Sequence, residues 1–513
     1  MLGNLDTAIY LLSLAIDEKP NSGATNYALA DIYFSNKDYV LATMYSEKSV
    51  ELEPQNLWYL RLLSSCYYNT YSIDQATNIY LKIIEQSDQY SDFVEAAEFF
   101  NNTSDYENEI LVIESATQKF GNSFELTKRK INILFLQGSV DEVVDECNQL
   151  VTQYNYEPDA YIVSAEYLFD LQLFDNCYSV LTEGFSKFPQ NGLSYFLSKY
   201  FVVTDNTDSA LFYLDNSFIN DDYSSQLYID FFINYRNFFS YKKLSSELDS
   251  VLDNFYSVFF NDFSSTVYLA NFYFVNNKFY KSIALYERAL NQNISDFDIY
   301  ASLFNMYSRF GMYEKLDSLS TFASELFPAQ PLIYLFKGIA SIKLNNLDDA
   351  YESLIFGKSL VFDQNDLIAY FDFYLSQYFR LQKDQSNENL YFNSALASAS
   401  QNCDLLAYFA YYFANNGLYK DKSFNLIGEC ILSDIESLNP YIAYIYSFIL
   451  FKFGDFDSAL TYINIAISNS NAENFVYFEL LGNIHLKLGN LDLANDAWLK
   501  SVNLGNIFLN KQL

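Results

Sequence analysis

The sequence predicts an all-α fold, an α-solenoid built from tandem helix-turn-helix repeats. One observation is the recurrence of small side chains, since Ala8, Ala42 and Ala76 follow one another at intervals of 34 residues. A second is that four prolines come twelve residues after the corresponding position of their own unit, namely Pro20, Pro54, Pro189 and Pro328. A constant period of this length is the signature of a repeat array, in which each repeat packs only on its neighbours.

The first helix of a unit is predicted by its apolar periodicity. Residues 23–35 read GATNYALADIYFS, and Asn26, Leu29, Ala30 and Tyr33 fall at i, i+3, i+4 and i+7. These positions share one face of a helix. We therefore expect this face to pack against the rest of the repeat.

The second helix of the same unit follows after a short turn. Residues 37–54 read KDYVLATMYSEKSVELEP, and the inner face of this helix carries Ala42, Ser46 and Ser49. Small side chains let the paired helices approach closely. Pro54 ends the helix, because proline has no amide hydrogen and its ring clashes with the preceding turn.

The turn between the two helices often carries glycine followed by a polar residue, as at Gly138, Gly311, Gly454 and Gly489. Glycine takes the left-handed conformation that ends a helix without steric cost. Asn or Asp then starts the next helix, since its side chain accepts from free amides and suits the helix dipole. This explains why the phrase GNLD occurs at both residues 3–6 and residues 489–492.

The unit resembles the tetratricopeptide repeat (TPR), and the last repeat shows the resemblance best. It supplies Leu481, Gly482, Gly489, Ala494 and Trp498 in the order of the TPR signature, with His485 where a tyrosine is usual. The chain looks most like long bacterial TPR proteins. The resemblance implies a right-handed superhelix whose concave groove is lined by the first helices and holds a protein or peptide.

The alanine-like position of the repeat can be followed along nearly the whole chain. It is assigned to Ala8, Ala42, Ala76, Glu109, Val143, Cys177, Ala210, Leu244, Ser282, Leu316, Ala350, about Leu390, Ser423, Ala459 and Ala494. This register predicts about fourteen helix pairs after an unpaired first helix. The intervals from Leu244 to Ser282 and from Ala350 to Leu390 are longer than the rest, so we expect perturbations near residues 250–262 and 380–400.

The predicted segments follow from this register. They are an orphan second helix of a truncated first repeat (1–20), the main TPR array (21–379), an irregular joint with a divergent repeat (380–401), the C-terminal repeats (402–505) and a tail (506–513). An orphan helix would leave Ile9, Leu12 and Ile16 partly open to water, so we expect the reading frame to lack its beginning.

The localisation expected from the sequence depends on whether residues before Met1 have been lost. No charged, apolar and cleavage region precedes the first repeat. The chain as it stands predicts a cytoplasmic protein, and a lost upstream signal would place it in the periplasm or cell envelope. The longest apolar run, residues 441–451, is shorter than the roughly 20 residues of a membrane span.

Composition excludes nucleic acid as a partner. The chain has 64 acidic and 30 basic residues and a net charge of −34. Nucleic-acid binding is driven by lysine and arginine. The acidic excess is expected on the convex face and loops, where it favours solubility.

No catalytic residue, metal site or cofactor is predicted. Cys147, Cys177 and Cys430 fall on inner positions of second helices, which favour a small apolar side chain. No CxxC motif occurs. His485, the only histidine, is expected to be a packed, hydrogen-bonded core residue rather than a catalytic one. We therefore expect a protein that is not an enzyme.

The expected partner site lies in the groove. Aromatic residues anchor peptide partners through large contact areas. The predicted binding residues are Trp58, Tyr68, Lys128, Asn132, Tyr408, Tyr412, Tyr441, Tyr444, Phe448 and Phe451. The last six are expected to form one aromatic strip, although the alternative that such rings are helix-packing core stays open.

The charges at groove positions are expected to cancel. Cations such as Arg309 and Lys343 are offset in this register by acids such as Asp372. Lys128 and Asn132 match the first pair of the carboxylate clamp found in some TPR proteins, but Val163 and Phe196 occupy later clamp positions. An adaptor for chaperone tails is therefore not expected.

Three function classes are compatible with the sequence. The leading one is a non-catalytic protein-protein interaction scaffold with an aromatic-lined concave groove. The second is a structural subunit of a bacterial cell-envelope assembly whose export signal is missing from this chain. The third, an enzyme with attached repeats, needs a separate catalytic domain, for which the repeat register leaves no room.

Overall fold

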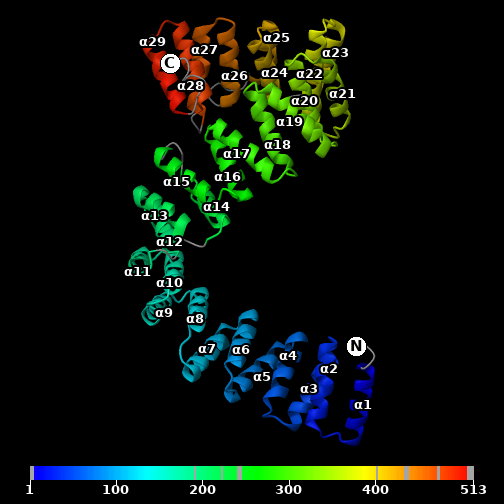
Figure 1. The fold of residues 1–513 in the computed structure, drawn as a ribbon, viewed down its shortest axis with the longest axis vertical. Coiled ribbons are helices and arrows are strands. Elements are labelled where there is room, and N and C mark those ends of the chain that lie inside the picture. Colours follow the sequence, from blue (N-terminus) through cyan, green and yellow to red (C-terminus); the bar gives the residue numbers. More distant parts are fainter. Residues whose placement is uncertain are drawn as a thin grey trace. The chain divides into compact units, whose positions relative to one another are not determined.

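All regular elements in the described part of the chain are α-helices. The computed structural model describes residues 5–189, 192–220, 223–239, 245–399, 402–431, 438–470 and 474–504. These residues form fourteen consecutive helix pairs preceded by α1 (Leu5–Glu18) (Figure 1). The prediction of an all-α solenoid of tandem helix-turn-helix repeats is confirmed.

The first helices of the pairs carry the even labels. They are α2 (Gly23–Ser35), α4 (Leu57–Asn69), α6 (Tyr90–Asn102), α8 (Phe124–Gln137), α10 (Pro158–Asp170), α12 (Leu193–Val203), α14 (Ser225–Asn234), α16 (Phe263–Val275), α18 (Phe297–Arg309), α20 (Pro331–Lys343), α22 (Asn365–Leu381), α24 (Cys403–Asn415), α26 (Pro440–Lys452) and α28 (Phe475–Lys487).

The second helices carry the odd labels. They are α3 (Tyr39–Leu52), α5 (Ile73–Gln86), α7 (Tyr106–Phe120), α9 (Val140–Gln153), α11 (Phe174–Lys187), α13 (Thr207–Asn220), α15 (Ser245–Val258), α17 (Phe279–Gln292), α19 (Tyr313–Leu326), α21 (Leu347–Ser359), α23 (Gln385–Ala399), α25 (Lys420–Ile431), α27 (Phe456–Asn469) and α29 (Leu491–Asn503).

The helices belong to two compact units, Met1–Asp222 and Tyr223–Leu513. Helices α1–α13 lie in the first unit and α14–α29 in the second. The predicted segment boundaries and the handedness of the superhelix stay predictions. Each unit is described by itself below.

The turns within the pairs show why glycine is common there but not obligatory. Gly489 has φ of 80°, and the next amide, that of Asn490, donates to the carbonyl of His485 at 2.9 Å. At the turn after α2, Lys37 takes the same left-handed conformation with φ of 63°. A left-handed residue ends the first helix in each case, and glycine only removes the steric cost of that conformation.

The alanine-like position is the fourth residue of each second helix after α1, and it is buried in every described pair. The residues there are Ala42, Ala76, Glu109, Val143, Cys177, Ala210, Leu248, Ser282, Leu316, Ala350, Glu388, Ser423, Ala459 and Ala494. Two positions of the predicted register were therefore wrong. Leu244 lies outside the described residues and Leu248 takes the position, while Leu390 is 63% exposed and Glu388 takes it.

Both errors have a physical reason. The chain between α14 and α15 is longer than in the other pairs, so the extra residues come before Leu248 rather than after it. Glu388 is charged and does not resemble a core residue, but its carboxylate accepts a hydrogen bond from the Tyr419 hydroxyl. Glu109 is buried at the same position in its own pair and lies against Arg129 and Asn101.

The cysteines divide into two classes. Cys66, Cys147 and Cys177 are buried free thiols, as expected of core positions. Burial raises the pKa of the Cys66 thiol to about 11 and that of Cys147 and Cys177 to about 12, so none is primed as a nucleophile.

The expectation of a free core cysteine was wrong for Cys430, which forms a disulfide with Cys403. Antiparallel pairing places the start of α24 beside the end of α25, and the two Cα atoms are 5.7 Å apart. This separation is suitable for a disulfide. The bond ties the two helices of this pair together.

Helices approach closely at Gly357 but not at Gly428, so we expect alanine substitutions at these two positions to change stability in opposite directions. A Cβ added at Gly357 on α21 would lie 2.5 Å from the Cβ of Tyr334 and 2.7 Å from the Phe371 ring. A Cβ at Gly428 on α25 would meet no atom within 4 Å. We expect Gly357→Ala to destabilise the protein by about 1–3 kcal/mol through overpacking, and Gly428→Ala to stabilise it by roughly 0.5–1 kcal/mol.

Urea unfolding followed by the helical circular-dichroism signal measures both effects. Equal midpoints for the two variants would contradict the close approach of α20, α21 and α22 at Gly357.

Candidate functional site

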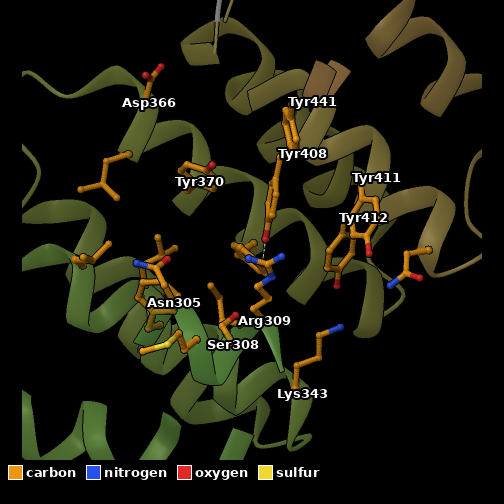
Figure 2. A pocket seen from close by; sticks show the side chains of 18 of the residues that line it. Asn305, Ser308, Arg309, Lys343, Asp366, Tyr370, Tyr408, Tyr411, Tyr412 and Tyr441 are labelled. Atoms are coloured by element: carbon orange, nitrogen blue, oxygen red, sulfur yellow. Dashed lines mark hydrogen bonds between the residues drawn. The ribbon is translucent and has the colours of Figure 1, made fainter. Parts of the chain in front are cut away.

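A large cleft lies inside the second unit. Its volume is about 1500 Å³, and it is lined by residues of α16, α18, α20, α22, α24, α26 and α28, together with Tyr313 and the turn before α22. These seven helices are all first helices of their pairs. Figure 2 shows the side chains that converge on the cleft from α18 to α26.

Tyrosines form the main wall of the cleft. Tyr408, Tyr411 and Tyr412 come from α24, and Tyr441 and Tyr444 come from α26 (Figure 2). Their spacing along α24 and α26 repeats at three or four residues, so they share one face of each helix. The cleft is therefore walled by rings with hydroxyl groups.

Helix α22 extends this wall with two further tyrosines. The Tyr370 ring lies 5.3 Å from that of Tyr408, edge to face. The Tyr374 and Tyr408 hydroxyls are hydrogen-bonded to each other. Behind them, the fully buried Phe373 stacks on Phe409 with 4.2 Å between ring centroids. This buried pair holds the tyrosine-bearing faces of α22 and α24 together.

Segments far apart in the sequence meet beside the cleft. Phe279 of α17 and Phe475 of α28 are in edge contact, with centroids 5.8 Å apart. The guanidinium of Arg309, which lines the cleft, lies 4.9 Å from the centre of the Phe279 ring. Helices α17 and α28 therefore meet next to Arg309.

Two cations project into the cleft. Arg309 and Lys343 are the last residues of α18 and α20, and both line it (Figure 2). The Lys343 ammonium lies 5.0 Å from the centre of the Tyr412 ring. Both side chains are exposed to the cleft, but surrounding protein atoms desolvate them, which lowers the pKa of each. Nearby Arg380 lowers the pKa of Lys343 further.

Acidic groups lie at a different part of the cleft. Asp363 and Asp366 belong to the turn before α22 and to its first turn. The Asp366 carboxylate accepts a hydrogen bond of 2.9 Å from Asn402. Figure 2 shows Asp366 well away from Arg309 and Lys343. The cleft thus has a cationic and an acidic region.

The hydroxyls of the cleft suit binding rather than proton transfer. Burial raises the pKa of Tyr441 to about 12 and shifts those of Tyr374, Tyr408 and Tyr444 upward as well. These groups stay protonated at neutral pH and act as hydrogen-bond donors.

The only histidine lies outside the cleft lining, on α28. His485 is half-buried, and desolvation lowers its pKa. Its Nδ1 has no hydrogen-bond partner among the described residues, so the expectation of a hydrogen-bonded core histidine was wrong for this atom.

The described ranges contain neither a cluster of metal-ligating side chains nor a membrane-spanning helix. No group of three or more His, Cys, Asp or Glu side chains in them is arranged to hold a metal ion. None of their helices is both long enough and apolar enough to cross a membrane.

Four of the predicted C-terminal site residues line the cleft, namely Tyr408, Tyr412, Tyr441 and Tyr444. The other two predicted rings do not line it. Phe448 packs against Tyr411 with 4.6 Å between centroids, and Phe451 packs against Phe456 of its own pair.

The predicted residues of the first unit lie on α4 and α8. Trp58 is 65% exposed and has the Arg61 guanidinium 5.2 Å from its ring, while Tyr68 contacts the edge of Phe99. Lys128 is exposed, and Asn132 accepts a hydrogen bond from the Tyr167 hydroxyl.

Sequence reasoning missed part of the cleft. Tyr370, Tyr374 and Tyr411 were not among the predicted site residues, although each lies on the inner face of a first helix. The predicted balance of groove charges was also wrong for Asp372, which is fully buried and contacts Lys358 and Ser394 instead of facing the groove. Tracing the helical face of α22 from Asp366 would have found the two tyrosines.

Comparison with protein-family models gives a match over the N-terminal part of the chain. The model of a family described as anaphase-promoting complex, cyclosome, subunit 3 matches residues 1–83. No match was found among curated proteins.

Three chains of solved structures are similar to this chain. A chain of the Naa15/Naa10 complex bound to HypK-THB is 12% identical, with a TM-score of 0.37, and the match covers 97% of this chain and 87% of that one. Yeast Tom70 is 13% identical, with a TM-score of 0.32 and coverage of 96% and 98%. A chain of the APC/C hetero-tetramer Cut9-Hcn1 is 14% identical, with a TM-score of 0.31 and coverage of 88% and 87%.

These identities and TM-scores are too low to carry over a function. In repeat length, helix pairing and turn geometry, the described repeats are of the tetratricopeptide type. The resemblance to bacterial members in particular stays a prediction.

Proposed function

We propose that this chain is a non-catalytic interaction scaffold that binds an extended peptide segment of another protein in the tyrosine-lined cleft. The observation that carries the proposal is the cleft itself, which gathers side chains from seven first helices of one unit. The TPR-type fold supports a scaffold role in general. The family model that matches residues 1–83 is named for a subunit of a complex, in keeping with such a role.

The size and the lining of the cleft favour a peptide. Its volume of about 1500 Å³ exceeds the roughly 300–1,000 Å³ of typical small-molecule pockets. Tyrosine offers a rigid apolar surface with a polar tip and is enriched among residues that dominate binding energy. Exposed Asn305 and Asn415 on the lining add amide groups that can bond a peptide backbone.

Trp58, Tyr68, Lys128 and Asn132 are proposed as a secondary contact surface on the first unit. The large exposed area of Trp58 supports this part of the proposal.

The alternative function is a structural subunit of a cell-envelope assembly. The disulfide between Cys403 and Cys430 favours it, because disulfides persist in oxidising compartments. Protein isolated from its native cells under denaturing, non-reducing conditions with an alkylating agent should then carry three adducts, on Cys66, Cys147 and Cys177. Five adducts would remove the support for this alternative.

The cleft proposal predicts that its exposed rings anchor the ligand. Tyr441 is 37% exposed and Tyr444 is half-buried, so both can contact a peptide, whereas Tyr412 is 9% exposed and packs on Phe373. We expect the Tyr441→Ala/Tyr444→Ala double variant to weaken peptide binding at least tenfold, about 1.4 kcal/mol. Fluorescence anisotropy with peptides selected from a random library on the wild-type protein measures the effect.

The matched control is Tyr351→Ala. Tyr351 is also 37% exposed but lies on the second helix α21, outside the cleft lining. It should leave binding unchanged, and both variants should keep the wild-type circular-dichroism signal. Equal loss of binding in the two variants, or unchanged binding in the double variant, would show that the peptide binds elsewhere.

A further inference from the structure

We propose that the cleft is selective for acidic peptides, and that an internal Asp or Glu side chain of the bound segment lies between Arg309 and Lys343. The apolar neighbours of this acidic residue would pack on the tyrosine wall. The proposal rests on the proposed function of the cleft as a peptide site and names the chemistry of its ligand.

The positions of the cations are the first support. Arg309 and Lys343 are 34 residues apart, which is one repeat, and each ends a first helix of adjacent pairs. Arg380 lies in the last turn of the next first helix, α22, close enough to Tyr412 to influence its pKa. Three successive repeats therefore carry a cation at the same end of the cleft region.

The second support is that no described carboxylate forms an ion pair with these cations. In the described part of the chain, no Asp or Glu forms an ion pair with Arg309, Lys343 or Arg380. Burial also disfavours the charged forms of Arg61, Lys130 and Lys278, but each of these pairs with a carboxylate. A desolvated cation without a partner gains most from an anionic ligand.

The cations are held in place by aromatic faces rather than by acids. The Arg309 guanidinium lies over Phe279, and the Lys343 ammonium lies over Tyr412. Cation–π contacts of this kind leave the N–H groups free to donate toward the cleft. The cations are thus positioned for a carboxylate before it arrives.

The simplest alternative is that these cations only complement helix dipoles. Lys452 and Lys487 also lie in last turns, and this general effect explains the sign of the charge. It does not explain why Arg309 and Lys343 both face one tyrosine-walled cleft. An anionic ligand accounts for both facts.

The extent of the cleft favours an internal acidic residue over a chain terminus. Besides Arg309 and Lys343, its lining includes Phe274 of α16, Tyr477 of α28 and Asp366 of α22. An extended segment can therefore contact other lining residues as well as the two cations. A lone terminal carboxylate would leave the rest of the lining unused.

The test is a selection of random peptides, displayed as internal segments without a free carboxyl terminus, on the full-length protein. We expect wild-type protein to enrich sequences containing Asp or Glu. We expect the Arg309→Glu/Lys343→Glu variant to enrich Lys or Arg instead. The single Lys343→Glu variant keeps the contact between Arg309 and Phe279 and should show the same change more weakly.

Affinity of the best wild-type peptide gives the quantitative readout. Lys343→Gln should weaken it at least fivefold, while Lys337→Gln, on the same helix but outside the cleft lining, should not. Circular dichroism should show the same helical signal for all variants.

The outcomes separate this inference from the proposed function. Peptides that depend on Tyr441 and Tyr444 but show no acidic preference, or the same preference on the charge-reversed variant, would overturn the inference and leave the peptide site standing. Acidic peptides that are selected only from a library with free carboxyl termini would overturn the internal placement. No enrichment over the Tyr441→Ala/Tyr444→Ala variant would overturn both.

Discussion

The close approach of the two helices in each pair is the constraint on which the rest of this structure depends. It is made at one position, the fourth residue of the second helix, where Ala42, Ala76, Ala350 and Ala494 are fully buried. Where this position holds a small side chain, the two helices can approach closely, and a left-handed turn residue such as Gly489 reverses the chain over a few residues. Repetition of this contact at an interval near 34 residues sets the first helices side by side.

This arrangement produces the cleft of the second unit. First helices present their inner faces to one another, so residues at matching positions gather on one surface. Arg309 and Lys343 occupy matching positions and bring one kind of charge to one region, while Tyr408 and Tyr441 lie at different positions of the inner faces of α24 and α26 and both line the cleft. The contact of Phe279 with Phe475 brings α17 and α28 together next to Arg309. The proposed peptide site is therefore a consequence of helix pairing rather than of a special loop.

Features that follow from the spacing of the repeat could be predicted from the sequence. Features that depend on which elements meet in space could not. Helix pairs, turn glycines and all but two of the buried positions were readable from the spacing of the repeat. The register failed at Glu388 and at Leu248 because the intervals before them are longer than the usual repeat: α22 has 17 residues, and the chain before α15 is longer than in the other pairs. The disulfide of Cys430 was missed because pairing with Cys403 depends on which helix ends meet. Tyr370 and Tyr374 share a helical face with Asp366, which the sequence indicates, but the hydrogen bond between Tyr374 and Tyr408 joins two repeats and could not be read from either one.

The central claim is that ligands bind in the cleft of the second unit. Its most direct test is site-specific photocrosslinking in the native cells, with p-benzoylphenylalanine placed at Tyr441 in one variant and at Tyr351 in another. The account predicts that the Tyr441 variant yields a crosslinked partner whose attached residues map to one short segment, while the equally exposed Tyr351 variant yields none. Crosslinks from Tyr351 but not from Tyr441 would contradict the account.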